Sequence, residues 1–217
     1  MSKEKERAAY ILKALAAMYP DAHCELNHSG PFQLLIATIL SAQTTDAHVN
    51  KVTPALFALA GDPAALAALA PETVENAIRS IGLYRNKAKN IMAACAMLAR
   101  DFAGQVPQTR AELLRLPGVG RKTANVVLSV AFHQPALAVD THVLRVAGRL
   151  ELTAAAAPDK AEQDLMALWP PEAWIDAHHR LIWHGRRCCK ARRPLCPQCR
   201  CRPYCRYEGL LFQARET

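Results

Sequence analysis

The sequence predicts an all-α protein, and its composition and apolar spacing are the two observations that support this. Alanine supplies 40 of the 217 residues, whereas only 13 are aromatic, and this balance favours helix over sheet. Apolar residues recur at helical spacing along most of the chain, and no strand alternation of useful length or fixed-period repeat appears. A chain of this length is sufficient for one or two domains with a buried core.

The expected helices follow one another closely and are separated by proline, glycine or capping residues. The first carries Tyr10, Ile11, Leu15 and Met18 on one face and stops before Pro20. The second, over 32–43, is nearly all apolar and is expected at the centre of the core. The remaining helices are expected over 46–60, 63–70, 71–80, 86–101, 109–116, 121–132, 141–150, 159–169 and 172–186.

The positive charge is concentrated at the C-terminal end. The net charge is +8, and residues 180–217 hold ten basic and two acidic side chains, whereas residues 1–179 are balanced. Such a basic region suits a polyanion such as DNA, although it would also serve simply to keep the protein in solution. No apolar run approaches the roughly 20 residues that cross a bilayer. The acidic residues near the N-terminus make a poor secretory signal, so a cytoplasmic protein without membrane contact is expected.

Six of the eight cysteines lie between positions 188 and 205. In a reducing compartment such a cluster indicates a metal site rather than disulfides. One frame through it is Cys189-x6-Cys196-x2-Cys199-x5-Cys205, whose four thiolates could bind zinc or a [4Fe–4S] cluster. The spacing favours the cluster, because zinc sites usually present two close pairs, but Cys188 or Cys201 could replace a neighbour. The isolated Cys24 and Cys95 are expected to be small buried core residues.

A tight turn between two short amphipathic helices stands out within 109–132. Pro117 ends the first helix, Gly118-Val119-Gly120 turns the chain, and Arg121 begins the second helix. Amide groups of a glycine turn at a helix N-terminus can hold a phosphate. The turn is therefore interpreted as a helix–hairpin–helix that grips the DNA backbone, against the alternative of an ordinary glycine-capped turn.

Two residues near this turn could carry chemistry. Lys122 lies in the first turn of the second helix, where the helix dipole and Arg121 both act against a charged ammonium, and only a neutral amine attacks carbon. Asp140 follows the apolar segment 136–139 and directly precedes a helix. A carboxylate there would cap the helix and remain ionised, which also suits a group that balances a developing positive charge.

With these motifs in place, the sequence resembles the endonuclease III family of DNA glycosylase/AP lyases, within the helix–hairpin–helix glycosylase superfamily. The resemblance extends from residue 32 to 205, and its signatures are 116–125 (LPGVGRKTAN), 139–142 (VDTH), 40–43 (LSAQ), 81–84 (IGLY) and the four-cysteine frame.

The resemblance implies two helical subdomains with a cleft between them. A six-helix barrel containing the hairpin (109–132) is expected over 22–135. A helical iron–sulfur domain, with its cluster loop at 189–205, is expected over 1–21 and 136–217. The resemblance also selects the [4Fe–4S] cluster on Cys189, Cys196, Cys199 and Cys205, and leaves Cys188 and Cys201 as spectators.

The resemblance also implies roles for single residues. Lys122 would be the nucleophile and Asp140 its catalytic carboxylate. Leu83 would be a wedge between base steps and Gln43 would fill the space that a flipped nucleotide vacates. Without the family, Leu83 is better interpreted as core. His142 would orient a phosphate or Asp140, or would only pack.

The implied activity is removal of oxidised pyrimidines from double-stranded DNA, followed by β-elimination at the abasic site, by a monomer. Adenine-specific mismatch glycosylases of the same fold lack the lysine and carry a further C-terminal domain, so the presence of Lys122 favours the bifunctional enzyme. A pyrimidine-dimer-specific relative and a non-catalytic DNA-binding module stay open as alternatives.

Overall fold

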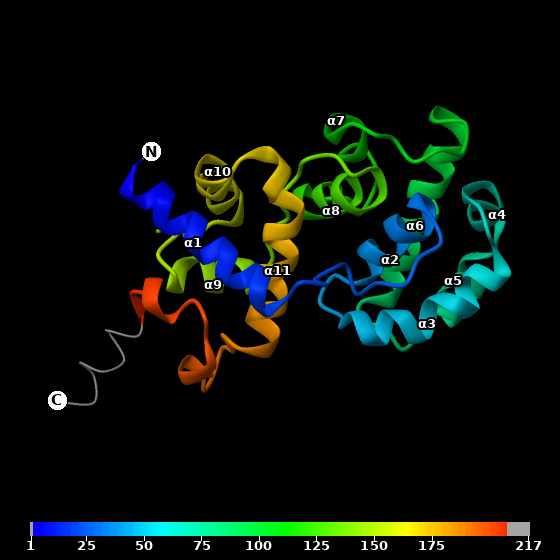
Figure 1. The fold of residues 1–217 in the computed structure, drawn as a ribbon. Coiled ribbons are helices and arrows are strands. Elements are labelled where there is room, and N and C mark those ends of the chain that lie inside the picture. Colours follow the sequence, from blue (N-terminus) through cyan, green and yellow to red (C-terminus); the bar gives the residue numbers. More distant parts are fainter. Residues whose placement is uncertain (1, 208–217) are drawn as a thin grey trace. The chain divides into compact units, whose positions relative to one another are not determined.

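The computed structural model describes residues 2–207, and every regular element in that range is a helix (Figure 1). The chain forms two compact units. The internal unit is Glu25–Gln134, and the terminal unit combines Met1–Cys24 with Pro135–Thr217. Each unit is described separately. None of the helices in 2–207 has the length and apolar character required to span a membrane.

The internal unit is built around one apolar helix. Pro31 occupies the first position of this helix, where a missing N–H costs nothing, and the residues from Leu34 to Leu40 are all buried. It contacts α3, α6 and α8, so it lies at the centre of the core as the sequence predicts. The helices of this unit are α2 (Pro31–Leu40), α3 (Asp46–Leu59), α4 (Pro63–Ala68), α5 (Pro71–Ala77), α6 (Tyr84–Asp101), α7 (Arg110–Leu113) and α8 (Arg121–Phe132).

The central helix α2 ends three residues earlier than expected. It stops at Leu40, not at Gln43, because a side chain from α6 caps it. The ammonium group of Lys87 donates to the carbonyl oxygens of Leu40, at 2.8 Å, and Ala42, at 2.6 Å. Carbonyls at a helix C-terminus lack partners within the helix, and this lysine supplies them from outside.

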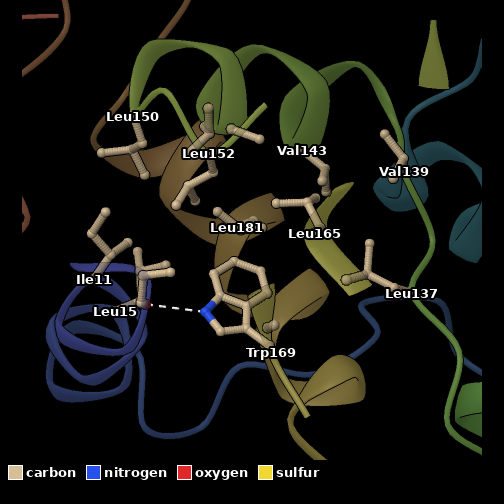
Figure 2. Close-up of a cluster of buried hydrophobic side chains, with 14 of the residues drawn as sticks. Ile11, Leu15, Leu137, Val139, Val143, Leu150, Leu152, Leu165, Trp169 and Leu181 are labelled. Atoms are coloured by element: carbon tan, nitrogen blue, oxygen red, sulfur yellow. Dashed lines mark hydrogen bonds between the residues drawn. The ribbon is translucent and has the colours of Figure 1, made fainter. Parts of the chain in front are cut away.

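The terminal unit brings the N-terminal helix onto the C-terminal third of the chain. Figure 2 shows Ile11 and Leu15 of α1 facing Val143, Leu165 and Leu181, all with no exposed surface. Burying one such side chain contributes about 2 kcal/mol. The elements of this unit are α1 (Lys3–Met18), α9 (Thr141–Arg149), α10 (Pro158–Leu168), the 3-10 turn η1 (Pro171–Ala173), α11 (Trp174–Arg187), and the 3-10 turns η2 (Cys196–Gln198) and η3 (Arg202–Tyr204).

One tryptophan ties the two ends of this core together. Trp169, directly after α10, is buried, and its indole nitrogen donates to the carbonyl of Ala8 in α1 at 3.0 Å (Figure 2). A buried indole N–H without a partner would be costly, so this bond fixes the register of α1 against the unit.

The two isolated cysteines have different environments. Cys95 is fully buried in α6, as expected, and burial raises the pKa of its thiol to about 12. Cys24 is only half-buried, so the prediction that it belongs to the core is wrong. It is the last residue of the N-terminal segment before the chain enters the internal unit.

Candidate active site and cysteine cluster

The predicted hairpin is present in the internal unit. The hydroxyl of Thr109 caps α7 by accepting from the amide of Glu112. After α7, the amide of Val119 donates to the carbonyl of Leu116 at 3.1 Å. Val119, between the two glycines, is buried. The helix α8 then begins at Arg121.

The two glycines of the turn meet different requirements. Gly118 has a φ of +80°, and a Cβ placed on it would lie 3.0 Å from the Cβ of Asn90 in α6. The turn therefore needs glycine at this position for backbone conformation and for close packing. Gly120 has an extended backbone with a φ of −96°, and open space surrounds the position of its Cβ. It leaves the amide groups at the start of α8 accessible to a ligand.

Lys122 is the second residue of α8, and its side chain is exposed. No acidic side chain lies in the first turn of α8, so the positive end of the helix dipole is not offset there. A lysine at this position can reach an anion held by the first amides of the helix. The geometry thus places an amine beside a candidate phosphate site.

Gln43 and Leu83 share an unusual backbone conformation. Gln43 has a φ of +56° and Leu83 a φ of +60°, a left-handed region that few residues other than glycine adopt. Both side chains are exposed, and Leu83, at 59%, is the most exposed large apolar side chain in residues 2–207. The interpretation of Leu83 as core is therefore wrong, and its exposure fits a wedge.

Asp140 lies in the terminal unit, at the N-terminus of α9. Its Oδ1 accepts a hydrogen bond from the amide of Val143 at 2.8 Å, which confirms the predicted cap. The segment 136–139 before it is buried and Asp140 itself is half-buried, so the apolar approach fixes where the carboxylate emerges.

His142, the second residue of α9, is packed against α11. Arg145 donates to its Nδ1 at 3.3 Å. A Cβ placed on Gly185 would lie only 2.9 Å from the Cβ of His142, so the two helices meet here without a gap. Burial lowers the pKa of His142, which favours the neutral imidazole. These contacts favour the packing role among those considered for this histidine.

The four cysteines of the preferred frame line one small cavity in the terminal unit. Arg149 and His184 line it as well. Four sulfur atoms around a common space form a donor set that suits a metal centre, and the chain therefore has a candidate metal site here. The four are Cys189, Cys196, Cys199 and Cys205.

A second grouping of donors overlaps this cavity. Ligand atoms of His184, Cys199 and Cys201 lie within 4.8 Å of one another. However, Cys201 is fully buried in the hydrophobic core and does not line the cavity. Its hydrogen bond to Cys199 and that of His184 lower the pKa of the Cys199 thiol to about 4. Cys188 lines the cavity too, and its thiol donates to the carbonyl of Leu195 at 3.6 Å.

Two arginines that the sequence analysis missed hold the cysteine loop. Arg145 donates to the carbonyls of Gly185, at 2.8 Å, and Cys189, at 3.2 Å. Arg149 donates to the carbonyl of Lys190 at 2.7 Å and approaches the sulfur of Cys189 at 3.6 Å. Their spacing of four residues on one helix was the available signal, since it places both on the same face of α9.

The basic region divides into paired and exposed side chains. Arg180 forms an ion pair with Asp176 at 2.7 Å, and Arg206 bridges Glu4, at 2.6 Å, and Glu151, at 3.3 Å. These ion pairs neutralise part of the excess positive charge within the protein. Exposed arginines of the cysteine loop provide the surface charge, namely Arg192, Arg193, Arg200 and Arg202. The basic residue Arg215 and the acids Glu208 and Glu216 lie outside the described residues.

Comparison with known proteins places these features in a family. Residues 36–171 match the HhH-GPD superfamily of base excision DNA repair proteins. The chain is 51% identical to endonuclease III of Synechocystis over 94% of both chains. It is 46% identical to endonuclease III of Escherichia coli over 94% of this chain and 97% of the relative.

Solved structures agree with the sequence matches. A trapped covalent intermediate of an endonuclease III with DNA is 52% identical, with a TM-score of 0.93 over 98% of this chain and 100% of the relative. A thermostable thymine-DNA glycosylase, 23% identical with a TM-score of 0.86 over 94% of this chain and 98% of the relative, shares the fold. From this likeness along nearly its whole length, the chain belongs to the endonuclease III family of helix–hairpin–helix base excision DNA repair proteins.

Proposed function

We propose that this protein removes oxidised pyrimidine bases from double-stranded DNA and then cleaves the strand at the resulting abasic site, with Lys122 as the nucleophile. The observation that carries the proposal is the likeness to an endonuclease III caught in a covalent intermediate with DNA. A covalent intermediate requires a nucleophile, and the exposure of Lys122 beside the hairpin turn supports its amine as that group.

The chemistry follows from an amine and a carboxylate. The Lys122 nitrogen bonds to C1′ of the sugar while the bond between C1′ and the base breaks, and the base leaves with the bonding electrons. Positive charge develops on the sugar during this step, and the Asp140 carboxylate stabilises it. The adduct opens to a Schiff base, which acidifies the C2′ hydrogen. When that proton leaves, its electron pair forms a C2′–C3′ double bond conjugated with the C1′=N bond. The C3′–O bond breaks at the same time, and the 3′ phosphate leaves with the electrons of that bond.

The exposed residues of the internal unit support base extrusion. A base in the duplex stack is out of reach, so the nucleotide must leave the stack. Leu83 is suited to enter between base steps as an apolar wedge, and Gln43 to fill the vacated space with a polar side chain. The amides of the Gly118-Val119-Gly120 turn would hold the DNA backbone, and His142 would support the position of Asp140 through α9.

The cysteine cavity is proposed to hold a [4Fe–4S] cluster on Cys189, Cys196, Cys199 and Cys205. The donor set fits, since these four cysteines line one space, and Arg149 donates toward the sulfur of Cys189 at 3.6 Å. No step of base excision changes an oxidation state, so the reaction needs no electron transfer from the cluster. The bound cluster would instead have a structural role and cross-link the loop. The loop would then present its exposed arginines to phosphate. A zinc site that uses His184, Cys199 and Cys201 is the second candidate.

The proposed substrate is duplex DNA that contains damaged pyrimidines or abasic sites, met by a monomer in the cytoplasm at the nucleoid. The experiment is a panel of duplex oligonucleotides with one lesion each, analysed for base release and for strand cleavage. We expect cleavage at thymine glycol with a β-elimination product. Lys122→Gln should abolish both products, whereas Lys51→Gln, a change at an exposed lysine of the same unit, should preserve them. Binding of the panel without base release by the wild type would instead support the non-catalytic DNA-binding module.

A further inference from the structure

Lys87, the lysine that caps α2, is buried. It lies in the first turn of α6 and is only 5% exposed. Its ammonium group donates to the carbonyl of Leu40 at 2.8 Å, to the carbonyl of Ala42 at 2.6 Å, and to the hydroxyl of Thr44 at 3.0 Å. An ammonium has three N–H groups, and all three have partners here, which compensates the cost of burying the charge.

All three acceptors surround one residue. Leu40 and Ala42 precede Gln43 and Thr44 follows it, so Lys87 holds the chain on both sides of Gln43. No basic residue lies in the last turn of α2, and the ammonium supplies the positive charge that a helix C-terminus favours. A non-glycine residue at φ near +56° persists only where its surroundings impose that conformation. Lys87 bonds to both neighbours of Gln43, and the amide of Thr44 also donates to the carbonyl of Ser41 at 3.0 Å.

The same lysine is joined to Leu83. The amide of Lys87 donates to the carbonyl of Leu83 at 3.0 Å, so Leu83 lies one helical turn before Lys87, as the N-cap residue of α6. A second bond reaches the loop of Leu83 from α3, the helix that follows the loop of Gln43, because Nε2 of His48 donates to the carbonyl of Ser80 at 3.0 Å. Through Lys87 and His48, the loop that carries Gln43 and the loop that carries Leu83 form one connected body.

We propose that Lys87 is a positioning residue that fixes the loops of Gln43 and Leu83 relative to each other, so that both side chains enter the DNA helix together. The inference rests on the proposed roles of Gln43 and Leu83 in base extrusion. Two loops that are ordered before binding avoid the entropy cost of ordering at the moment of extrusion. Loss of the lysine should therefore slow extrusion and leave the Schiff-base chemistry of Lys122 intact.

The test compares two DNA substrates under single-turnover conditions with the full-length protein. One duplex carries thymine glycol paired with adenine, which must be extruded, and the other carries a preformed abasic site, which has no base to extrude. For Lys87→Met we expect base excision from the first to slow by about tenfold, and borohydride trapping on the second to change by less than about threefold. Lys89→Met, an exposed lysine on the same helix, is the matched control and should behave as wild type on both.

A second arm separates positioning from general destabilisation. In a Gln43→Ala, Leu83→Ala background, Lys87→Met should slow excision by less than about twofold further, because residues that act as a unit are not additive. A merely structural lysine would slow excision equally in both backgrounds. Thr44→Val removes only one acceptor and serves if Lys87→Met does not fold; it should slow excision of thymine glycol in the same direction.

The outcomes are distinct. Three results would overturn the inference: excision at the wild-type rate by Lys87→Met, an equal slowdown on both substrates, or an undiminished slowdown in the Gln43→Ala, Leu83→Ala background. In each case, borohydride trapping by the wild type would leave the proposed function standing. Wild-type excision by the Gln43→Ala, Leu83→Ala protein would instead remove the proposed roles of those two residues and the inference with them. No adduct from the wild type would overturn the proposed function itself.

Discussion

The α-carbon of Gly118 in the hairpin turn lies against Asn90 of α6, so closely that a Cβ on Gly118 would be 3.0 Å from the Cβ of Asn90. The turn is thus not an isolated loop but is fitted to the helix that also carries Lys87. The hairpin and the loop of Leu83 are both connected to α6, which gives the exposed residues of the internal unit a common support.

This contact predicts different effects for the two glycines of the turn. Gly118→Ala should lower the free energy of unfolding by about 2 kcal/mol, because the alanine would adopt a left-handed conformation and collide with Asn90. Gly120→Ala should change stability by less than about 0.5 kcal/mol, since its backbone is extended and its surroundings are open. Chemical denaturation of the two variants measures both values.

Gly120→Ala also tests the phosphate site. Its Cβ would project into the space where a phosphate approaches the amides of α8, so affinity for undamaged duplex DNA should fall by about tenfold, or about 1.4 kcal/mol. Fluorescence anisotropy with a labelled duplex checks this. Unchanged affinity with unchanged stability would mean that the turn does not hold the DNA backbone.

Asp140 both caps α9 and is proposed to stabilise positive charge on the sugar, and two substitutions separate these roles. Asparagine caps a helix about as well as aspartate, so Asp140→Asn should keep stability within about 0.5 kcal/mol, whereas Asp140→Ala should cost about 1 kcal/mol. Both should reduce the rate of base excision by about 100-fold, because neither can balance positive charge on the sugar.

The matched control for Asp140 is Asp62, which caps α4 by accepting from the amide of Ala65 at 2.9 Å. Asp62→Asn should leave both stability and excision unchanged. If Asp140→Asn excised the base at the wild-type rate, the role of Asp140 would be limited to capping α9, and its charge would not contribute to catalysis.

Because Lys87 is buried, we expect the free energy of unfolding to depend on pH. Burial lowers the pKa of Lys87 in the folded protein below its ordinary value of 10.5. Between the folded and the ordinary pKa the unfolded chain binds more protons than the folded one, so stability rises with pH. The free energy of unfolding of the wild type, relative to Lys87→Met, should therefore increase as pH rises from 7 toward about 10. Urea titrations over this range measure it, and a flat or falling difference would contradict a buried, charged lysine.

The cysteine cavity predicts which thiols a metal needs. Replacement of Cys189, Cys196, Cys199 or Cys205 by serine should remove iron, sulfide and the absorbance at about 400 nm that an iron–sulfur cluster gives. Cys201→Ser and Cys188→Ser should retain iron and sulfide in stoichiometric amount. Loss of metal from Cys201→Ser, or stoichiometric zinc in an anaerobically prepared wild type, would support the site on His184, Cys199 and Cys201 instead.

Most helices could be predicted from the sequence because their information is local. Apolar spacing and the flanking prolines define α3, α4, α5 and α8 to within a few residues. The end of α2 could not be predicted, because its cap is Lys87, 47 positions beyond Leu40 in the sequence. A cap of this kind has no signature in the segment that it ends.

The site shows the same division. The glycine turn, the position of Lys122 at the start of a helix and the cap at Asp140 could be predicted from the sequence, because each depends on its immediate neighbours. Arg149 was missed because it binds the carbonyl of Lys190, 41 residues away, and a backbone carbonyl has no side-chain identity to recognise. Without the family resemblance, the sequence favoured Leu83 as a core residue. An apolar side chain gives no sign of the left-handed backbone conformation at Leu83, which accompanies its exposure.

The central claim is that the amine of Lys122 bonds to the sugar. Incubation of the protein with abasic-site duplex DNA and borohydride, followed by proteolysis and mass spectrometry, locates the bond directly. We predict one sugar remnant on the peptide that contains Lys122, and no adduct with Lys122→Gln even though that variant still binds the DNA. A remnant on another lysine or on the N-terminal amine, or an undiminished adduct with Lys122→Gln, would contradict the account.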